Sequence, residues 1–165
     1  MQLPVARMVD PEKLERLSAL TVAYVKAQEE IILQQGMPLS PRQVQDAQLA
    51  GVQDTARVRI LIVDRILAPE NEELAEAAAQ AQVITHASRA VTMGHGIIIR
   101  ADRWQDRELI LHQLVHVAQC ERFGGPEKYV PQYLSDRSTC ADFSLGSLED
   151  EARNLARNIC AQAEK

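Results

Sequence analysis

Residues 106–123, DRELILHQLVHVAQCERF, limit most strongly how this chain can fold. Their pattern is helical, and the middle of the segment is almost wholly aliphatic, so the helix must be covered by other elements. It nevertheless carries His112 and His116. A spacing of four residues places both imidazoles on one face of a helix, one turn apart and about 6 Å along its axis. Because buried ring nitrogens need polar partners, we expect a core helix with a polar site on one face.

Helical and strand patterns alternate through the rest of the chain. Asp10-Pro11 and Ser40-Pro41 are helix starts, and the run VRILIV at 58–63 favours a strand over a buried helix. The predicted helices cover 11–35, 41–50, 71–84 and 106–123, then a short or kinked helix at 126–134, a loop at 135–146 and a last helix from 147. Two strand pieces surround a glycine-rich corner at 91–100.

This order predicts an α+β fold, mostly helical, with a small β-sheet preceding the helix of residues 106–123. A length of 165 residues suits a single domain. Within it we expect N-terminal helices at 1–55, the small sheet plus a helix at 56–105, and the histidine-bearing and last helices at 106–165. The oligomeric state is left open.

Composition excludes several functional classes. The formal net charge is −5 and the chain has no long basic stretch, so we expect no nucleic-acid partner. No apolar run approaches the roughly 20 residues that span a bilayer, and the first residues lack a signal-peptide pattern. Three cysteines, an odd number, argue against a disulfide framework. We therefore expect a cytoplasmic chain without a membrane partner.

The spacing of His112 and His116 is the spacing with which two histidines on a helix share one tetrahedral metal ion. A catalytic zinc site takes three protein ligands and leaves one position open. Glu149, Asp150 and Glu151, in the last helix, are candidates for the third ligand. The alternative is that both histidines are ordinary core or surface residues and that the acidic trio compensates the helix dipole.

The segment LILHQLVHVAQCERFG resembles the active-site helix of gluzincin-type zinc metallopeptidases, whose common form is HELVHVxQ. In that family a strand precedes the helix and a later glutamate helix, marked E-x-x-A or E-x-E-A, gives the third ligand; here GIIIR precedes and LEDEA follows. The resemblance covers residues 91–157, and the size is that of the smallest members, the minigluzincins. It implies a zincin-like fold with one Zn²⁺ held by His112, His116 and Glu149, with Glu151 as the alternative third ligand, and a peptide or protein substrate.

Gln113 departs from the HExxH motif, in which this position is a glutamate that takes a proton from the zinc-bound water. Glutamine has nearly the same shape but cannot accept that proton. We therefore expect a metallopeptidase that binds zinc but is nearly inactive as written. Either a glutamate was deliberately replaced by its amide, which the otherwise intact site favours, or the chain is a natural pseudopeptidase that binds a peptide or protein without cutting it.

Three further predictions concern the surroundings of this site. Ile97 and Ile98 would belong to an edge strand that pairs with an extended peptide substrate, or else to an ordinary core strand. Tyr133, or Tyr129, would stabilise the developing oxyanion, as the family resemblance suggests, unless both only pack. His95, on the glycine-rich corner, is predicted to be a surface histidine.

Overall fold

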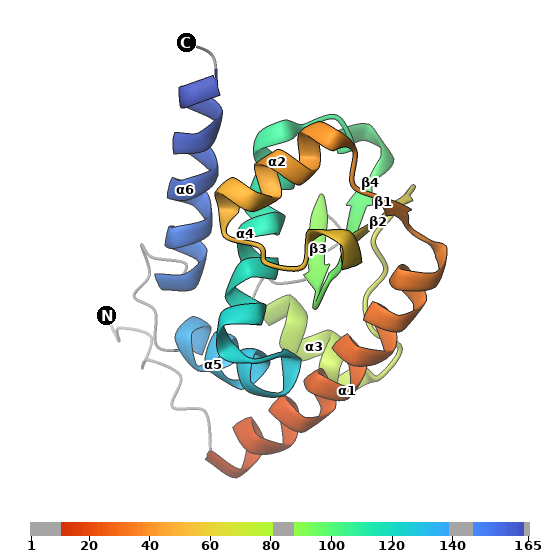
Figure 1. The fold of residues 1–165 in the computed structure, drawn as a ribbon. Coiled ribbons are helices and arrows are strands. Elements are labelled where there is room, and N and C mark those ends of the chain that lie inside the picture. The colour runs from red at the N-terminus through yellow and green to blue at the C-terminus, as the bar shows by residue number, and fades with distance from the viewer. Residues whose placement is uncertain (1–10, 81–87, 139–146, 164–165) are drawn as a thin grey trace, which may run out of the picture.

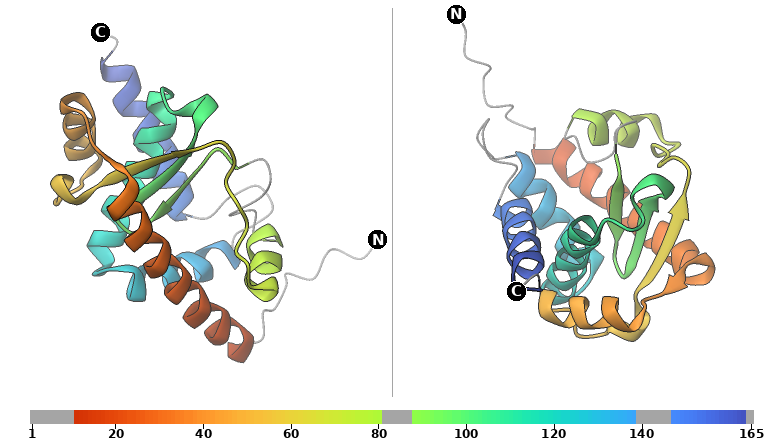
Figure 2. Two further views of the ribbon diagram at one scale, coloured as in Figure 1. Left: turned by 90° about the vertical axis from the view of Figure 1, so that its right-hand side faces the viewer. Right: turned by 90° about the horizontal axis from the view of Figure 1, so that it is seen from above.

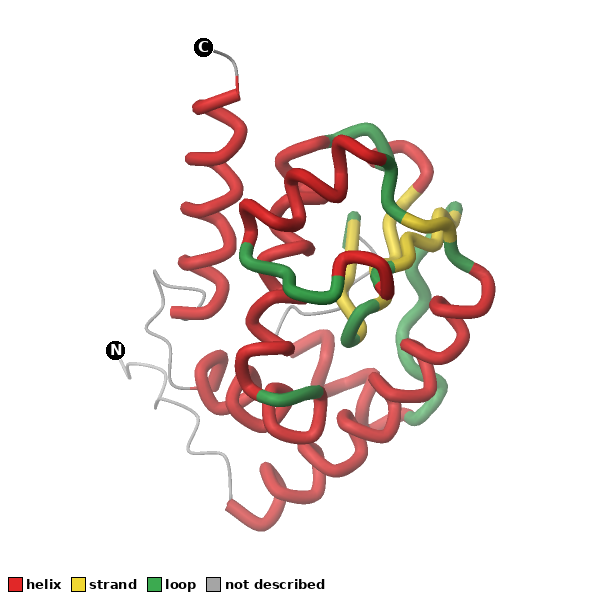
Figure 3. The backbone as a smooth tube through the Cα atoms, viewed as in Figure 1, coloured by secondary structure: helices red, strands yellow, loops and turns green. Residues whose placement is uncertain are grey.

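The computed structural model describes residues 11–80, 88–138 and 147–163 of the chain. Within them, helices surround a small mixed sheet (Figures 1 and 3), so the α+β class predicted from the sequence is confirmed. The elements are α1 (Pro11–Gln35), β1 (Met37–Pro38), α2 (Pro41–Ala50), β2 (Arg59–Val63), α3 (Glu72–Gln80), β3 (Ala90–Met93), β4 (Gly96–Arg100), α4 (Arg107–Phe123), α5 (Pro126–Ser138) and α6 (Ser147–Ala163).

Local signals set the ends of the best-defined helices. Ser40 caps α2 in a capping box with Gln43, and Asp106 caps α4 by accepting a hydrogen bond from the backbone N–H of Leu109. Gly51 and Gly124 follow these two helices in the left-handed conformation, with φ of 98° and 95°. These signals are local in the sequence, so the predicted bounds of α2 and α4 agree with the structure to within a residue.

The sheet has the strand order β1-β2-β4-β3. The strand favoured at 58–63 is β2, which pairs parallel with β4, whereas β3 and β4 form an antiparallel hairpin. Of the two alternatives for Ile97 and Ile98, the core strand is confirmed and the edge strand is wrong, because β4 pairs with both β2 and β3, whereas β1 and β3 are the outer strands. Ile97 is fully buried and Ile98 is 9% exposed. Consecutive isoleucines are typical of a strand covered on both faces, which is why they belong to an inner strand.

Helices cover both faces of this sheet. Ile97 and Ile99 point into a core shared with α2, α4 and Ala152 of α6, whereas Ile98 points into a core shared with α1. The left view of Figure 2 shows α1 crossing the strands diagonally. Beyond the sheet, α6 packs against α4, and α5 contacts both α4 and α1. The histidine-bearing helix α4 is therefore enclosed by the sheet, α2, α5 and α6.

One predicted boundary differs from the structure. The helix α5 continues through Pro131 to Ser138, although a loop was predicted from residue 135. Pro131 is the sixth residue of α5, so its missing N–H removes only one early hydrogen bond and the helix persists. The predicted helix at 71–84 corresponds to α3. Residues 81–84 of that predicted helix lie outside the described residues, as do residues 139–146 of the predicted loop. In the described part of the chain, no helix is both long and apolar enough to cross a bilayer.

Candidate metal centre

His112 and His116 lie on the face of α4 that packs against α6. Their ring centroids are 4.9 Å apart, and the ring planes are inclined to each other by 69°. His116 is buried, and the side chain of His112 is 22% exposed. The predicted pair is therefore formed by one helix in the interior of the molecule, with an opening to solvent on the His112 side.

The first turn of α6 brings Glu149 to these two rings. Its Oε2 atom lies 3.0 Å from Nε2 of His112, and its Oε1 atom lies 3.1 Å from Nε2 of His116. One ligand atom from each of the three residues lies within 4.8 Å of the others, and no other group of this kind occurs among the described residues. Glu151 instead hydrogen-bonds Gln119 and Arg122 at the surface. The structure thus brings together the three predicted ligands and keeps the alternative, Glu151, apart.

This donor set fits Zn²⁺. Two imidazole nitrogens and a carboxylate are ligands that zinc takes in catalytic sites. With zinc–ligand bonds of roughly 2.0–2.1 Å, tetrahedral geometry requires about 3.3 Å between ligand atoms. The distances of 3.0 and 3.1 Å join the two rings to different oxygens of Glu149. With one ligand atom taken from each residue, the three atoms lie within 4.8 Å of one another, so rotations of these side chains would bring them to that spacing.

Electrostatics keep Glu149 ionised. Burial raises the pKa of its carboxyl group, but hydrogen bonds from His112 and His116, together with the charge of His116 and a hydrogen bond from Tyr133, hold that pKa well below its ordinary value. The Tyr133 hydroxyl donates to Oε1 of Glu149 over 2.7 Å. Burial and the neighbouring Glu149 charge raise the pKa of Tyr133 well above its usual value, so the phenol keeps its proton. Tyr133 therefore lies beside the candidate ligands, held by one of them.

Sequence reasoning missed Gln119, which is completely buried one turn after His116. Its Oε1 atom lies 2.9 Å from Nδ1 of His116 and accepts a hydrogen bond from the Tyr129 hydroxyl, also over 2.9 Å. Tyr129 thus contacts the far side of His116 rather than the ligand side. Two signals were present in the sequence: Gln119 stands at the final glutamine of the HELVHVxQ form, and positions 112, 116 and 119 share a helix face.

Gln113 lies on α4 with 6% of its surface exposed. Its Oε1 atom accepts a hydrogen bond of 2.8 Å from the hydroxyl of Thr92 on the edge strand β3. The same hydroxyl lies 3.2 Å from the backbone oxygen of Gln113. The amide oxygen of Gln113 is therefore engaged by the sheet, a contact that no sequence pattern indicated.

The prediction of a surface position for His95 is wrong, because its side chain is only 17% exposed. Its Nε2 atom lies 2.9 Å from Glu121 at the end of α4, and its Nδ1 atom lies 3.7 Å from Glu29 of α1. The interaction with Glu29 raises the pKa of His95, burial lowers it by less, and the hydrogen bond to Glu121 raises it again. The two carboxylates bind opposite sides of the ring, so this cluster connects elements rather than forming a second metal site.

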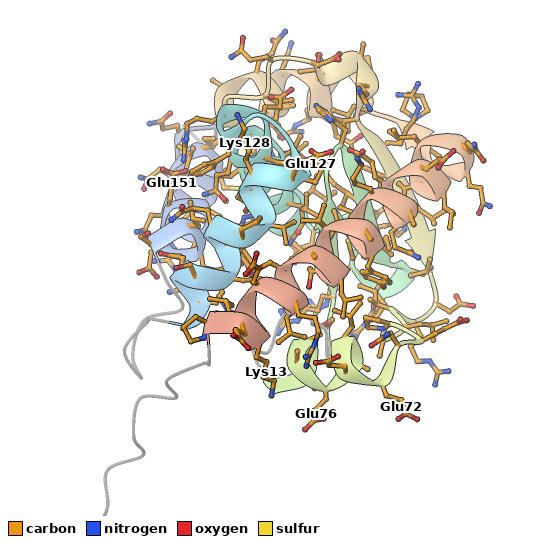
Figure 4. The ribbon with its side chains drawn as sticks, turned by 90° about the horizontal axis from the view of Figure 1, so that it is seen from below. Lys13, Glu72, Glu76, Glu127, Lys128 and Glu151 are labelled. Atoms are coloured by element: carbon orange, nitrogen blue, oxygen red, sulfur yellow. The ribbon has the colours of Figure 1, made fainter. Side chains whose placement is uncertain are left out.

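The remaining candidates lie away from the three ligands. Burial raises the pKa of the Cys120 thiol to about 12, so it stays protonated, whereas Cys140 lies outside the described residues. Figure 4 shows Glu151 on α6 at the same side of the molecule as Glu127 and Lys128, which begin α5. These three charged side chains are exposed, and none of them belongs to the group that could hold an ion.

No protein-family model, curated protein or solved structure matches the chain. The resemblance to gluzincins therefore rests on the motif residues alone.

Proposed function

We propose that this chain is a zinc-binding protein of the metallopeptidase type, in which His112, His116 and Glu149 hold one Zn²⁺. The observation that carries the proposal is the convergence of two Nε2 atoms and one carboxylate at 3.0 and 3.1 Å in a largely buried position. Ion pairs alone also satisfy these groups. The metal hypothesis is preferred because the spacing of the histidines and the glutamate helix both match the gluzincin pattern.

When bound, Zn²⁺ would activate water and polarise a peptide carbonyl. The chain's own residues would divide the remaining work. Tyr133 holds the carboxylate of Glu149 through a hydrogen bond of 2.7 Å and keeps its own proton. Gln113 can hydrogen-bond a water but cannot take its proton, and loss of a general base costs roughly 10²–10⁴ in rate. The proposed activity is therefore hydrolysis of a peptide or protein substrate that is nearly silent while position 113 is glutamine.

The glutamine at position 113 favours a second candidate, a zinc-containing module that binds a peptide or protein without cutting it. The hydroxyl of Thr92 donates to Oε1 of Gln113 and would donate equally well to a carboxylate there, so this contact fits both candidates. This candidate corresponds to a natural pseudopeptidase, whereas the first corresponds to a peptidase in which glutamate was replaced by its amide.

The zinc site is tested by metal analysis of the purified protein and of three variants. We expect close to one zinc per chain, a sharp fall in Glu149→Gln and in His116→Ala, and no change in Glu151→Gln, because Glu151 is directed to Gln119 and Arg122. Zinc content that is far below one per chain and is the same in all four proteins would reject the proposal.

The two candidates are separated by restoring the carboxylate. We expect Gln113→Glu to cleave members of a broad peptide library, while the chain as written and the double variant Gln113→Glu/His116→Ala do not. If Gln113→Glu binds zinc yet cleaves nothing, the binding module is the better explanation. The double variant excludes cleavage by a contaminating protease.

A further inference from the structure

The start of α6 is held by a side chain from α5. Asp136 lies in the last turn of α5, and its carboxylate accepts hydrogen bonds from the first two residues of α6. The hydroxyl of Ser147 donates to Oδ1 of Asp136 over 2.8 Å, and the backbone N–H of Leu148 donates to Oδ2 over 3.1 Å. Both oxygens of Asp136 are therefore used on one end of a neighbouring helix.

This contact supplies what the first turn of a helix lacks. The first N–H groups of an α-helix have no partner within the helix, and the N–H of Leu148 is one of them. Such a group is usually satisfied by a side chain just before the helix, whereas here an aspartate of another helix accepts from it. A carboxylate at this place also meets the partial positive charge of the helix N-terminus. Asp136 therefore acts as a cap that α5 supplies to α6.

The capped turn carries the third candidate ligand, because Glu149 directly follows Leu148. The backbone oxygen of Leu148 also accepts from Nε2 of Gln119 over 2.9 Å, so both backbone polar groups of Leu148 are bound by side chains of other helices. The hydroxyl of Tyr133, on α5, donates to the carboxylate of Glu149 over 2.7 Å. Tyr133 and Asp136 are three residues apart and share one face of α5. That face therefore holds Glu149 both by its side chain and through the residue before it.

We propose that Asp136 is a positioning residue, which fixes the first turn of α6 so that the carboxylate of Glu149 faces His112 and His116 before an ion binds. Without the cap this turn frays, and zinc would bind only the fraction of molecules in which it is ordered. The inference rests on the proposed zinc site. It adds to that site a residue of α5 that is not one of the three ligands.

The test compares Asp136→Ala with Asp136→Asn and with the control Gln132→Ala, which changes an exposed glutamine of α5. Alanine removes both acceptors. Asparagine keeps the cap, because its oxygen can accept from the N–H of Leu148 while its amino group donates to the hydroxyl of Ser147. These variants separate the loss of the two hydrogen bonds from the loss of the charge and from a change elsewhere on α5.

The first readout is amide hydrogen exchange of the metal-free protein, resolved by residue. We expect Asp136→Ala to speed exchange about 3–30-fold at Glu151 and Ala152, near the start of α6, which is the size of effect that the loss of a helix cap produces. Exchange at Ile159, nearer the other end of α6, should not change. Asp136→Asn and Gln132→Ala should exchange as the wild type does.

The second readout is zinc affinity, measured by competition with a chromophoric chelator. We expect Asp136→Ala to weaken zinc binding about 3–30-fold, because binding must then order the first turn of α6. Asp136→Asn and Gln132→Ala should bind as the wild type does. An Asp136→Ala protein with wild-type exchange in that turn, or with wild-type zinc affinity, would overturn the inference. Faster exchange along the whole of α6 would also overturn it, because the change would then be a general loss of stability.

Failure of the proposed function gives a different result. A wild-type chain that binds no zinc rejects the zinc site, and exchange in the first turn of α6 then decides alone whether Asp136 holds that turn. If Asp136→Ala does not fold, Ser147→Ala replaces it, because this variant removes only the hydrogen bond to Oδ1. Faster exchange confined to the first turn of α6 in Ser147→Ala supports the inference, and unchanged exchange overturns it.

Discussion

Replacing His95 with glutamine should destabilise the chain by an amount that depends on pH. His95 lies between two carboxylates, 2.9 Å from Glu121 and 3.7 Å from Glu29, with 17% of its side chain exposed. Hydrogen bonds to charged groups contribute about 1.5–3 kcal/mol each, whereas a looser ion pair contributes about 0–1 kcal/mol. We therefore expect His95→Gln to lower the free energy of unfolding by about 2–3 kcal/mol where the ring is charged.

The sign of the pH dependence follows from the three pKa shifts. The pKa of His95 is raised in the folded chain, so its contribution is fully present below the unfolded value near 6.5 and is lost as pH rises through the folded value. Burial raises the pKa values of Glu29 and Glu121. Hydrogen bonds and the charge of His95 outweigh this effect, so both pKa values are lower than usual in the folded chain. Their contribution is present above about pH 4.5 and is lost as pH falls through the folded values. The cluster should therefore stabilise the fold most between about pH 4.5 and 6.5.

Urea unfolding of wild type and His95→Gln at pH 5.5 and pH 9, with chelator present, measures this difference directly. We expect the loss to shrink to about 1 kcal/mol at pH 9, where only a neutral hydrogen bond is removed. Lys26→Met is the control, because it breaks an exposed ion pair with Glu127 and should change stability little at either pH. A loss of equal size at both pH values would refute the assignment of a charged His95.

Three other predictions concern the core, the hairpin and the metal. Leu114→Ala removes a completely buried side chain of α4 and should cost about 2–5 kcal/mol in urea unfolding, with an unchanged m-value. Gly94→Ala should cost about 1–3 kcal/mol in the same assay, because Gly94 has a φ of 62° and a Cβ atom there would collide with the carboxylate of Glu29. Zinc at 1,000 times its dissociation constant should stabilise the wild type by about 4 kcal/mol, seen as a rise in Tm that is absent in Glu149→Gln; an equal rise in both would show binding elsewhere.

Signals that act over a few residues predicted much of the fold. Proline at the first position of α1 and α2, the Asp106 cap and the glycine after α4 gave helix bounds that the structure reproduces. The glycine-rich corner gave the β3–β4 hairpin. The histidine pair followed from helical spacing, whereas the selection of Glu149 over Glu151 needed the family resemblance, because both residues lie at the start of α6.

Contacts between distant segments could not be predicted in this way. Thr92 meets Gln113 across 21 residues, Gln119 meets Leu148 across 29, and His95 meets Glu29 across 66. A periodic pattern indicates that a polar residue lies on a buried face, but not which polar group of another element comes to meet it. The order of the strands could not be predicted for the same reason. The isoleucines of β4 indicate burial on both faces, but the strands that pair with β4 are not specified by its own sequence.

The polar residues of α4 also explain how so apolar a helix acquires a single orientation. Apolar side chains such as Leu111, Leu114 and Val117 are buried around much of its circumference, so hydrophobic burial alone defines its rotation weakly. His112, Gln113, His116 and Gln119 each find a hydrogen-bond partner on a neighbouring element. Rotating the helix by one residue would leave these groups buried without partners, at a cost of about 1–3 kcal/mol each. The side chains that assemble the candidate metal centre are therefore also the ones that fix the rotation of α4 in the core.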